Sequence, residues 1–347
     1  MFADMGDANR PGGKRLVIHA GLGKSGSSAI QRYCRDHPQE LRRAGALYLG
    51  THLERAEPSP LDFASVEALH DALPTPEAED RLVALLTAKI ASRPGIRTFV
   101  WSQIALAVQA PLLGRVIARL APLCETEVLL YFRHQADWLV SAYLQWGVKH
   151  KTDPGPILPF ADWIPQAASR GADYRAVIER WIAAVGRDRL HLRAYDAAAD
   201  VVADFVSVAR LGAKAEDDGR TRQYETPDPM VMMLFRLLNG QRDAPAPPGA
   251  LYRLIAESGL ERRRYREVDP ASTLPSGADW ARFAATFDDG NAGLARDFGL
   301  TLSPAGPGPA PDPVHPAPAA AIPALLDLIL AMDRRIGALE QQLKRKG

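Results

Sequence analysis

The residues best suited to chemistry in this sequence lie near its beginning, in the stretch LVIHAGLGKSGSSAIQ at positions 16–31. A short apolar run there leads into two glycines, a lysine and a cluster of small residues. Glycines let a backbone approach an anion closely, a helix that begins directly afterwards presents unpaired N–H groups, and a lysine adds a mobile positive charge. The pattern predicts a phosphate-binding loop made by Gly23, Lys24, Ser25, Gly26, Ser27 and Ser28.

The spacing of this loop differs from that of the nucleoside triphosphatase loop, G-x-x-x-x-G-K-[ST]. If Gly23-Lys24-Ser25 were its end, the first glycine would stand at position 18, where the sequence has Ile18. Two predicted strands could carry the acid that binds Mg²⁺ in ATP chemistry, at 97–102 and 127–133. They end in Ser102-Gln103 and in Arg133, so neither supplies a carboxylate. We therefore expect no metal at this site, and a P-loop kinase-like enzyme is kept as an alternative.

A second group of polar residues follows the segment EVLLYFR at 127–133, which we predict to be a strand. Arg133 stands at its end, and Ser141 lies two helical turns further on. Open parallel sheets bind ligands beyond the carboxyl ends of their strands, so we expect both residues to face the crevice of Lys24 and to bind a second phosphate. An ion pair of Arg133 with Asp137, one helical turn away, is the simpler alternative.

These motifs resemble those of the sulfotransferases that use 3′-phosphoadenosine-5′-phosphosulfate (PAPS). Positions 24–28 match the K-[ST]-G-[ST]-[ST] core of that family's 5′-phosphosulfate loop, and His19 and Gly21 add the H-x-G-x-x-K start of its bacterial branch. The family's 3′-phosphate motif, R-x-x-x-D-x-x-x-S-x-[YF], is matched by Arg133, Asp137, Ser141 and Tyr143. The resemblance covers residues 15–212 and, more weakly, the chain to 300.

The resemblance implies a P-loop NTPase-like fold, PAPS as the sulfuryl donor and no metal. Lys24 would stand near the oxygen that bridges phosphate and sulfate, where it would offset developing negative charge. Residues 25–28 would hold the 5′-phosphate, and Arg133 and Ser141 would hold the 3′-phosphate. The acceptor would be a hydroxyl of a small molecule or glycan, and a carbohydrate or glycolipid is the candidate.

The base that would take the proton of the acceptor is where the sequence departs from the family. In the bacterial branch the strand that corresponds to TFVWSQ often ends in a glutamate, whereas this chain has Gln103, whose amide cannot accept a proton at neutral pH. The catalytic candidates are therefore Lys24, the position of Gln103, and His70 as a substitute base, with His52 as a second substitute. An acceptor acidic enough to need no base, and a catalytically impaired binding protein, are kept as alternatives.

The composition is that of a globular protein, with 47% hydrophobic and 24% charged residues. Lys and Arg number 42 against 41 Asp and Glu, so no overall charge attracts nucleic acid or a membrane surface. The chain has two cysteines, which are too few for a disulfide framework, and no apolar run of roughly 18 residues. We expect a cytoplasmic protein with no membrane span and no nucleic-acid partner.

The periodicity predicts short apolar strands that alternate with helices, which is typical of an α/β fold of three layers with a parallel sheet flanked by helices. The expected strands cover 15–20, 45–50, 97–102, 127–133 and 189–195, and one helix is expected from 27 to 44. The C-terminal third is more helical. The predicted organisation is a disordered N-terminus (1–13), one sulfotransferase-like α/β domain (14–302), a Pro/Ala-rich linker (303–322) and a C-terminal amphipathic helix (323–347).

The C-terminal helix carries a coiled-coil-like seam, because its apolar residues are spaced 4, 3, 4, 3 and 4 apart. These residues are Leu325, Ile329, Met332, Ile336, Leu339 and Leu343. The seam predicts a homo-oligomer formed through this helix. A helix that docks back on its own domain is the alternative, because the seam is short.

Overall fold

The structure is a computed structural model that describes residues 13–56, 58–151, 153–167, 172–196, 198, 200–212 and 277–308, with scattered positions in 232–245, 274–275 and 325–339. Residues 1–12 and 309–324, which hold the predicted disordered N-terminus and most of the predicted linker, lie outside the described residues. The chain forms two compact units. The first comprises 1–134, 168–223 and 289–304, and the second comprises 135–167, 224–288 and 305–347. The range predicted as one domain thus contributes to both.

The first unit is built on a five-stranded sheet in which every described pairing is parallel. Its strands are β1 Arg15–Gly21, β2 Ala46–Tyr48, β3 Thr98–Ser102, β4 Glu125–Phe132 and β5 Leu190–Ala194, in the spatial order β2-β3-β1-β4-β5. The helices of this unit are α1 Ser27–Asp36, α2 Pro38–Arg43, α3 Val66–Ala72, α4 Ala78–Ala91, α5 Ala110–Leu120, α8 Tyr174–Val185, α9 Val201–Val208 and α13 Asp288–Phe298, with short 3₁₀ helices η1 Ile104–Val108 and η4 Arg187–Arg189. The predicted α/β class with a parallel sheet is confirmed.

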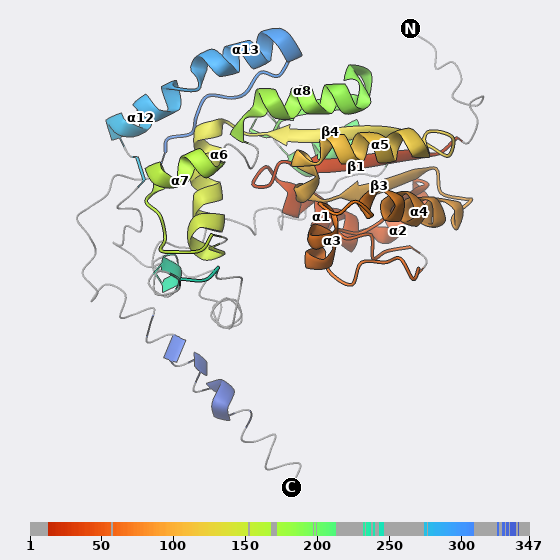
Figure 1. Cartoon of the computed structure of the whole chain (residues 1–347), viewed down its shortest axis with the longest axis horizontal. Helices are drawn as coiled ribbons and strands as arrows, with labels where there is room; N and C mark the ends of the chain where they lie inside the picture. The colour runs from red at the N-terminus through yellow and green to blue at the C-terminus, as the bar shows by residue number, and fades with distance from the viewer. Residues whose placement is uncertain are drawn as a thin grey trace. The chain divides into compact units, whose positions relative to one another are not determined.

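Both faces of the sheet are covered because alternate strand residues point to opposite sides. Leu16 and Ile18 of β1 pack into one apolar cluster with residues of α4, α5 and α8. Val17, between them, packs into a second cluster with residues of α1, α2 and α9. The sheet is therefore the middle layer of three, and Figure 1 shows the strands running beside these helices.

The first helix is shorter than predicted. The sequence favours one helix from 27 to 44, but α1 ends at Asp36 and α2 begins at Pro38. A proline has no N–H to donate and its ring crowds the preceding turn, so it is placed at the start of the second helix instead. Both helices still bury apolar side chains, because Ile30 and Tyr33 of α1 and Leu41 of α2 are all buried.

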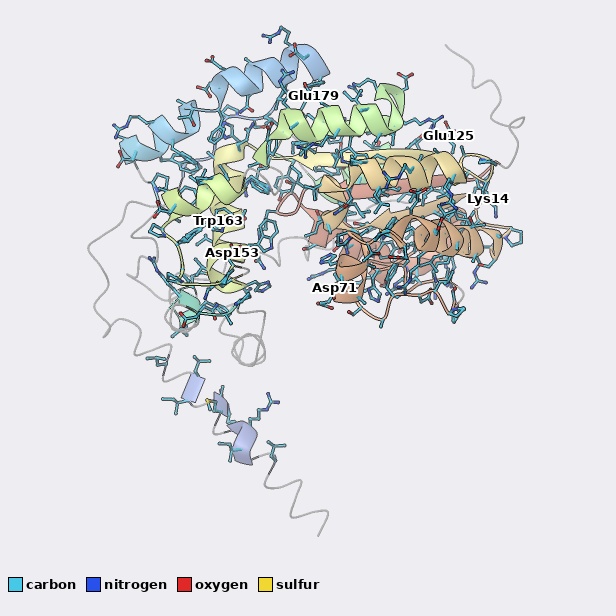
Figure 2. The ribbon with its side chains drawn as sticks, viewed as in Figure 1. Lys14, Asp71, Glu125, Asp153, Trp163 and Glu179 are labelled. Atoms are coloured by element: carbon cyan, nitrogen blue, oxygen red, sulfur yellow. The ribbon has the colours of Figure 1, made fainter. Side chains whose placement is uncertain are left out.

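The amino ends of the parallel strands meet at one edge of the sheet. There Lys14 and Glu125 lie close together (Figure 2), and the N–H of Glu125 donates a hydrogen bond to the carbonyl of Lys14 over 2.9 Å. The opposite edge, at the carboxyl ends, carries the loop after β1 and the residues that follow β2, β3 and β4. Parallel sheets place ligands at that edge.

The second unit is helical in its described part. It contains α6 Gln135–Ala142, the π-helix η2 Tyr143–Lys149, α7 Phe160–Ala167 and α12 Gly277–Ala285. The ring of Tyr143 packs edge-on against Phe160 and Trp163 (Trp163 is labelled in Figure 2), with centroids 5.4 and 5.6 Å away. Residues 135–149 are thus helical throughout, and the second half of this segment is wound as a π-helix.

The beginning of the predicted linker is attached to the second unit. The N–H of Gly306 donates to Asp137 Oδ2 over 2.9 Å, and Trp280 Nε1 donates to the Gly306 carbonyl over 3.0 Å. A side chain on Gly308 would overlap the ring of Trp280. Residues 305–308 are therefore held by α6 and α12.

Candidate functional site

The predicted phosphate loop leaves the sheet at the carboxyl end of β1 and runs to the start of α1. The N–H of Leu22 donates to the carbonyl of Tyr131 over 3.0 Å, which ties the loop to β4. Two of its residues have left-handed backbones, Lys24 with φ 65° and Gly26 with φ 81°. A lysine in this region is uncommon and costs conformational energy, so the fold holds the Lys24 backbone against its intrinsic preference.

Gly26 is required by the neighbours of the loop as well as by its backbone. A Cβ at this position would lie 2.9 Å from side-chain atoms of Tyr195 and Val201. Glycine therefore lets the start of α1 pack directly on Tyr195, which follows β5, and on Val201 at the start of α9.

The polar groups of this loop are only partly satisfied within the described residues. The first N–H groups of a helix have no partner inside it, and Gly26, the N-cap of α1, offers no side-chain cap. The Ser25 hydroxyl is buried, and no hydrogen-bond partner for it lies among the described residues. Ser27 Oγ donates to the Leu22 carbonyl over 2.9 Å, and Ser28 is exposed. An anion bound here would satisfy both the helix N–H groups and the Ser25 hydroxyl.

His19 links the strand under this loop to its neighbour. Its ring is buried, and Nδ1 lies 2.8 Å from Ser102 Oγ at the end of β3. Burial lowers the pKa of His19 from 6.5 to about 3, so the ring is neutral at physiological pH. A neutral imidazole there joins β1 to β3 without adding charge below the loop.

Arg133 follows the last residue of β4 and belongs to the same unit as Lys24. Its Nε lies 3.5 Å from Asp196 Oδ1, and Tyr174 donates its hydroxyl to the Arg133 carbonyl over 2.8 Å. The alternative partner, Asp137, instead accepts the hydrogen bond from Gly306. Sequence reasoning missed Asp196, which lies 63 positions further along the chain than Arg133. An anion at Arg133 would share the guanidinium with this carboxylate.

Ser141 belongs to the second unit, where it is the penultimate residue of α6 and is half-buried. The residues of the phosphate loop and Arg133 therefore belong to the first unit, whereas Ser141, the other residue proposed for the second phosphate, belongs to the second.

Gln103 is buried, and both ends of its amide are hydrogen-bonded to backbone. Its Oε1 accepts from the N–H of Ala105 over 3.1 Å and so caps η1, while its Nε2 donates to the carbonyl of Thr51 over 3.2 Å. A carboxylate could make the first of these bonds but not the second. The Gln103 amide therefore has a structural role, because it joins η1 to the turn after β2.

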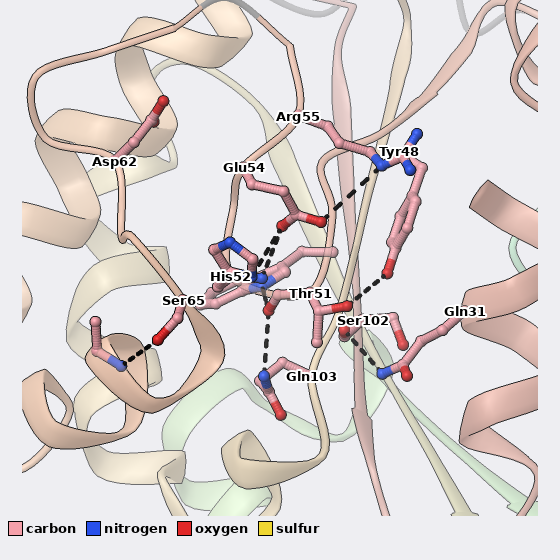
Figure 3. Close-up of polar contacts among 12 residues, drawn as sticks. Gln31, Tyr48, Thr51, His52, Glu54, Arg55, Asp62, Ser65, Ser102 and Gln103 are labelled. Carbon is pink, nitrogen blue, oxygen red and sulfur yellow. Dashed lines mark hydrogen bonds and ion pairs between the residues drawn. The ribbon is translucent and has the colours of Figure 1, made fainter. Parts of the chain in front are cut away.

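The two candidate histidines differ in their surroundings. His70 lies exposed on α3. His52 follows β2, and its Nδ1 lies 3.4 Å from Glu54 Oε2 (Figure 3). Glu54 was missed by sequence reasoning, although the H-x-E spacing beside a glycine could have indicated it.

No group of three or more His, Cys, Asp or Glu residues that could hold a metal ion is found among the described residues. No helix in that part of the chain is long and apolar enough to cross a membrane.

No protein-family model matches this chain, and no curated relative is found. Among solved structures, it is similar to a sulfotransferase from Alicyclobacillus acidocaldarius at 17% identity and a TM-score of 0.38, over 74% of this chain and 100% of that one. It is similar to the sulfotransferase domain of the Synechococcus PCC 7002 olefin synthase at 15% identity and a TM-score of 0.30, over 83% of this chain and 98% of that one. A retinol dehydratase in complex with androsterone and the inactive cofactor PAP is similar at 16% identity and a TM-score of 0.27, over 62% and 63%. The first two are sulfotransferases by name, the family that the motifs resemble.

Proposed function

We propose that this protein transfers the sulfuryl group of PAPS to a hydroxyl of a small-molecule or glycan acceptor, with a carbohydrate or glycolipid as the candidate class. The observation that carries the proposal is the loop between β1 and α1. Its Lys24 has a left-handed backbone, no side chain caps the helix, and the Ser25 hydroxyl has no partner in the part of the chain that the structure describes. These features fit an anion bound at the start of a helix.

The chemistry that PAPS supplies is a sulfuryl group on a good leaving group, the 5′-phosphate. The protein has to position that group and offset the negative charge that grows on the bridging oxygen. Lys24 would supply the positive charge, residues 25–28 would hold the 5′-phosphate through N–H groups, and Arg133 with Ser141 would hold the 3′-phosphate.

The experiment that tests the proposal is binding of adenosine 3′,5′-bisphosphate, measured by calorimetry. We expect saturable binding without a divalent cation, and a large loss of affinity in Lys24→Ala and Arg133→Ala. Arg35→Ala is the matched control, because it removes an exposed positive charge from the far end of α1. Absence of binding, or equal binding by all variants, would refute the proposal. Tighter binding of Mg²⁺–ATP would favour the kinase alternative.

A second candidate, a sulfotransferase-like protein that binds the nucleotide but does not transfer sulfate, is favoured by Gln103. Its amide is fully used by backbone groups where the resembled family often has a glutamate. Transfer of labelled sulfate from PAPS to any acceptor in a panel of alcohols, phenols and sugars would rule this candidate out.

We also propose that the C-terminal helix assembles copies of the chain. Its described seam residues Leu325, Ile329, Met332, Ile336 and Leu339 are 42–58% exposed, and an a/d seam is complementary to a second copy of itself. Light scattering of an Ile329→Lys, Ile336→Lys double variant should show a smaller assembly than the wild type. Arg334→Gln, at a position away from the seam, is the control, and an unchanged mass in the double variant would contradict the proposal.

A further inference from the structure

The loop that follows β2 is built as a closed turn at the carboxyl edge of the sheet. The N–H of Leu49 donates to the Val100 carbonyl of β3 over 2.8 Å, and the N–H of Arg55 returns to the Leu49 carbonyl over 3.0 Å. Leu53 is fully buried within the turn although its backbone is left-handed, with φ 65°. A non-glycine residue in this conformation persists only where its surroundings enforce it, and such residues concentrate at functional sites.

The turn is also fixed to the end of β3 by side chains. The Thr51 carbonyl accepts a hydrogen bond from Gln103 Nε2 over 3.2 Å (Figure 3). It accepts another from Trp101 Nε1, also over 3.2 Å. In the sheet β3 lies between β2 and β1, so the turn and the loop of Lys24 leave strands that are two interstrand spacings, or about 10 Å, apart. The two segments therefore open on the same edge, separated by one strand.

Within the turn, Glu54 is positioned to hold the ring of His52. The carboxylate accepts the backbone N–H of His52 over 3.0 Å at Oε2, and the same oxygen faces His52 Nδ1 at 3.4 Å. Its other oxygen, Oε1, lies 4.0 Å from Arg55 Nε (Figure 3). A side chain on Gly50 would overlap this carboxylate, so the glycine makes the room that Glu54 occupies.

The other edge of the His52 ring is the accessible one. Nδ1 is buried beside Glu54 Oε2 at 3.4 Å and makes no hydrogen bond to any described residue, yet 19% of the side chain is exposed, so that exposure belongs to the remaining atoms. With the proton on Nδ1, on the side of the carboxylate, Nε2 would be the ring atom that accepts a proton. His70, in contrast, is exposed on α3.

We propose that His52, oriented by Glu54, is the general base of the reaction, in the role that Gln103 cannot fill. This inference rests on the proposed function. In the transfer step, His52 Nε2 takes the proton of the acceptor hydroxyl while the acceptor oxygen forms a bond to sulfur. The bond between sulfur and the bridging oxygen breaks, and its electron pair stays on the 5′-phosphate of adenosine 3′,5′-bisphosphate. The imidazolium then returns its proton to solvent, with Glu54 stabilising the charged ring.

The test compares His52→Gln and Glu54→Gln with His37→Gln. His37 is a matched control because it lies at the carboxyl end of α1, away from the loop of Lys24. Labelled PAPS is supplied with water, phenol or p-nitrophenol as the probe acceptor. His52→Gln should lower kcat for phenol by about 100-fold at unchanged KM for PAPS, with a smaller loss for the more acidic p-nitrophenol. Glu54→Gln should lower kcat by a smaller factor, again at unchanged KM, and His37→Gln should match the wild type.

A readout independent of turnover is the protonation of the His52 ring, seen in long-range ¹H–¹⁵N NMR spectra of the wild-type protein. We expect the proton on Nδ1 and a bare Nε2, and a mixture of the two tautomers in Glu54→Gln. A proton resident on Nε2, or wild-type transfer to phenol by His52→Gln, would overturn the assignment of the base. Failure of the wild type to bind adenosine 3′,5′-bisphosphate would instead overturn the proposed function.

Discussion

β1 and β3 are neighbours in the sheet, but the polar groups that follow their carboxyl ends differ in how far they are hydrogen-bonded. After β1, the Ser25 hydroxyl finds no hydrogen-bond partner among the described residues, and no side chain caps the start of α1. After β3, both ends of the Gln103 amide are bonded to backbone. Buried polar groups are normally satisfied, so a loop that leaves them open is suited to receive a ligand, whereas a fully bonded side chain is suited to hold the fold together.

This difference explains why a motif match is a useful guide to the role of the residues after β1 but not to the role of Gln103 after β3. A glutamate at the corresponding position of the family that the motifs resemble points to a base, but here Gln103 connects η1 to the turn after β2. The chemistry that it would have supplied has to come from another side chain or be absent.

The largest expected effect comes from adding a side chain to the loop after β1, where polar groups are unsatisfied. Gly26→Ala should destabilise the protein by about 3 kcal/mol, because a Cβ would overlap Tyr195 and Val201 and the backbone is left-handed. Binding of adenosine 3′,5′-bisphosphate should be lost as well. Urea unfolding and calorimetry measure the two effects.

The matched control is Gly45→Ala, because Gly45 also has a positive φ, 72°, but its Cβ would make only ordinary contacts, the nearest at 3.6 Å from Arg97. It should show the backbone cost alone. Equal losses in the two variants would mean that the packing on Gly26 is slack and that the loop is not held as described.

An intermediate effect is expected from changing Gln103, whose amide is hydrogen-bonded at both ends. Gln103→Glu replaces a donor to the Thr51 carbonyl with a buried carboxylate oxygen and should cost about 2 kcal/mol of folding free energy, with no gain in sulfate transfer. Urea unfolding checks the stability, and Gln109→Glu, which makes the same change at a half-buried helix start, is the control. A stable Gln103→Glu with raised transfer would show that this position is a catalytic one after all.

The smallest effect concerns His19, which joins the two strand ends. Its pKa lies at about 3 in the folded protein, below the ordinary 6.5, so the unfolded chain binds more protons between these values and stability falls as the pH falls. This group alone should remove about 1 kcal/mol between pH 7 and pH 5.5. Between pH 7 and pH 5.5, the free energy of unfolding of His19→Gln, measured in urea titrations, should fall by about 1 kcal/mol less than that of the wild type. An identical pH dependence in both proteins would mean that the ring is not held neutral.

The sequence by itself determined the strands, their alternation with helices and the loop after β1. These features are local: the apolar runs, the glycines and the parallel connections follow from chain periodicity and the handedness of the backbone. Even the error in the first helix was local, since Pro38 is visible in the sequence and ends α1 by the usual rule.

Only the tertiary structure decided which polar groups are used and which are left open. Asp196 lies beside Arg133, Thr51 meets Gln103, and Gly306 reaches Asp137, and each of these contacts joins residues between 52 and 169 positions apart. No periodicity or motif encodes such pairs, because they form only when the sheet brings its strand ends to one edge and the helices pack against it. The partners of a side chain, and therefore whether it can act as a base, as an anion ligand or as a structural joint, are consequences of that packing.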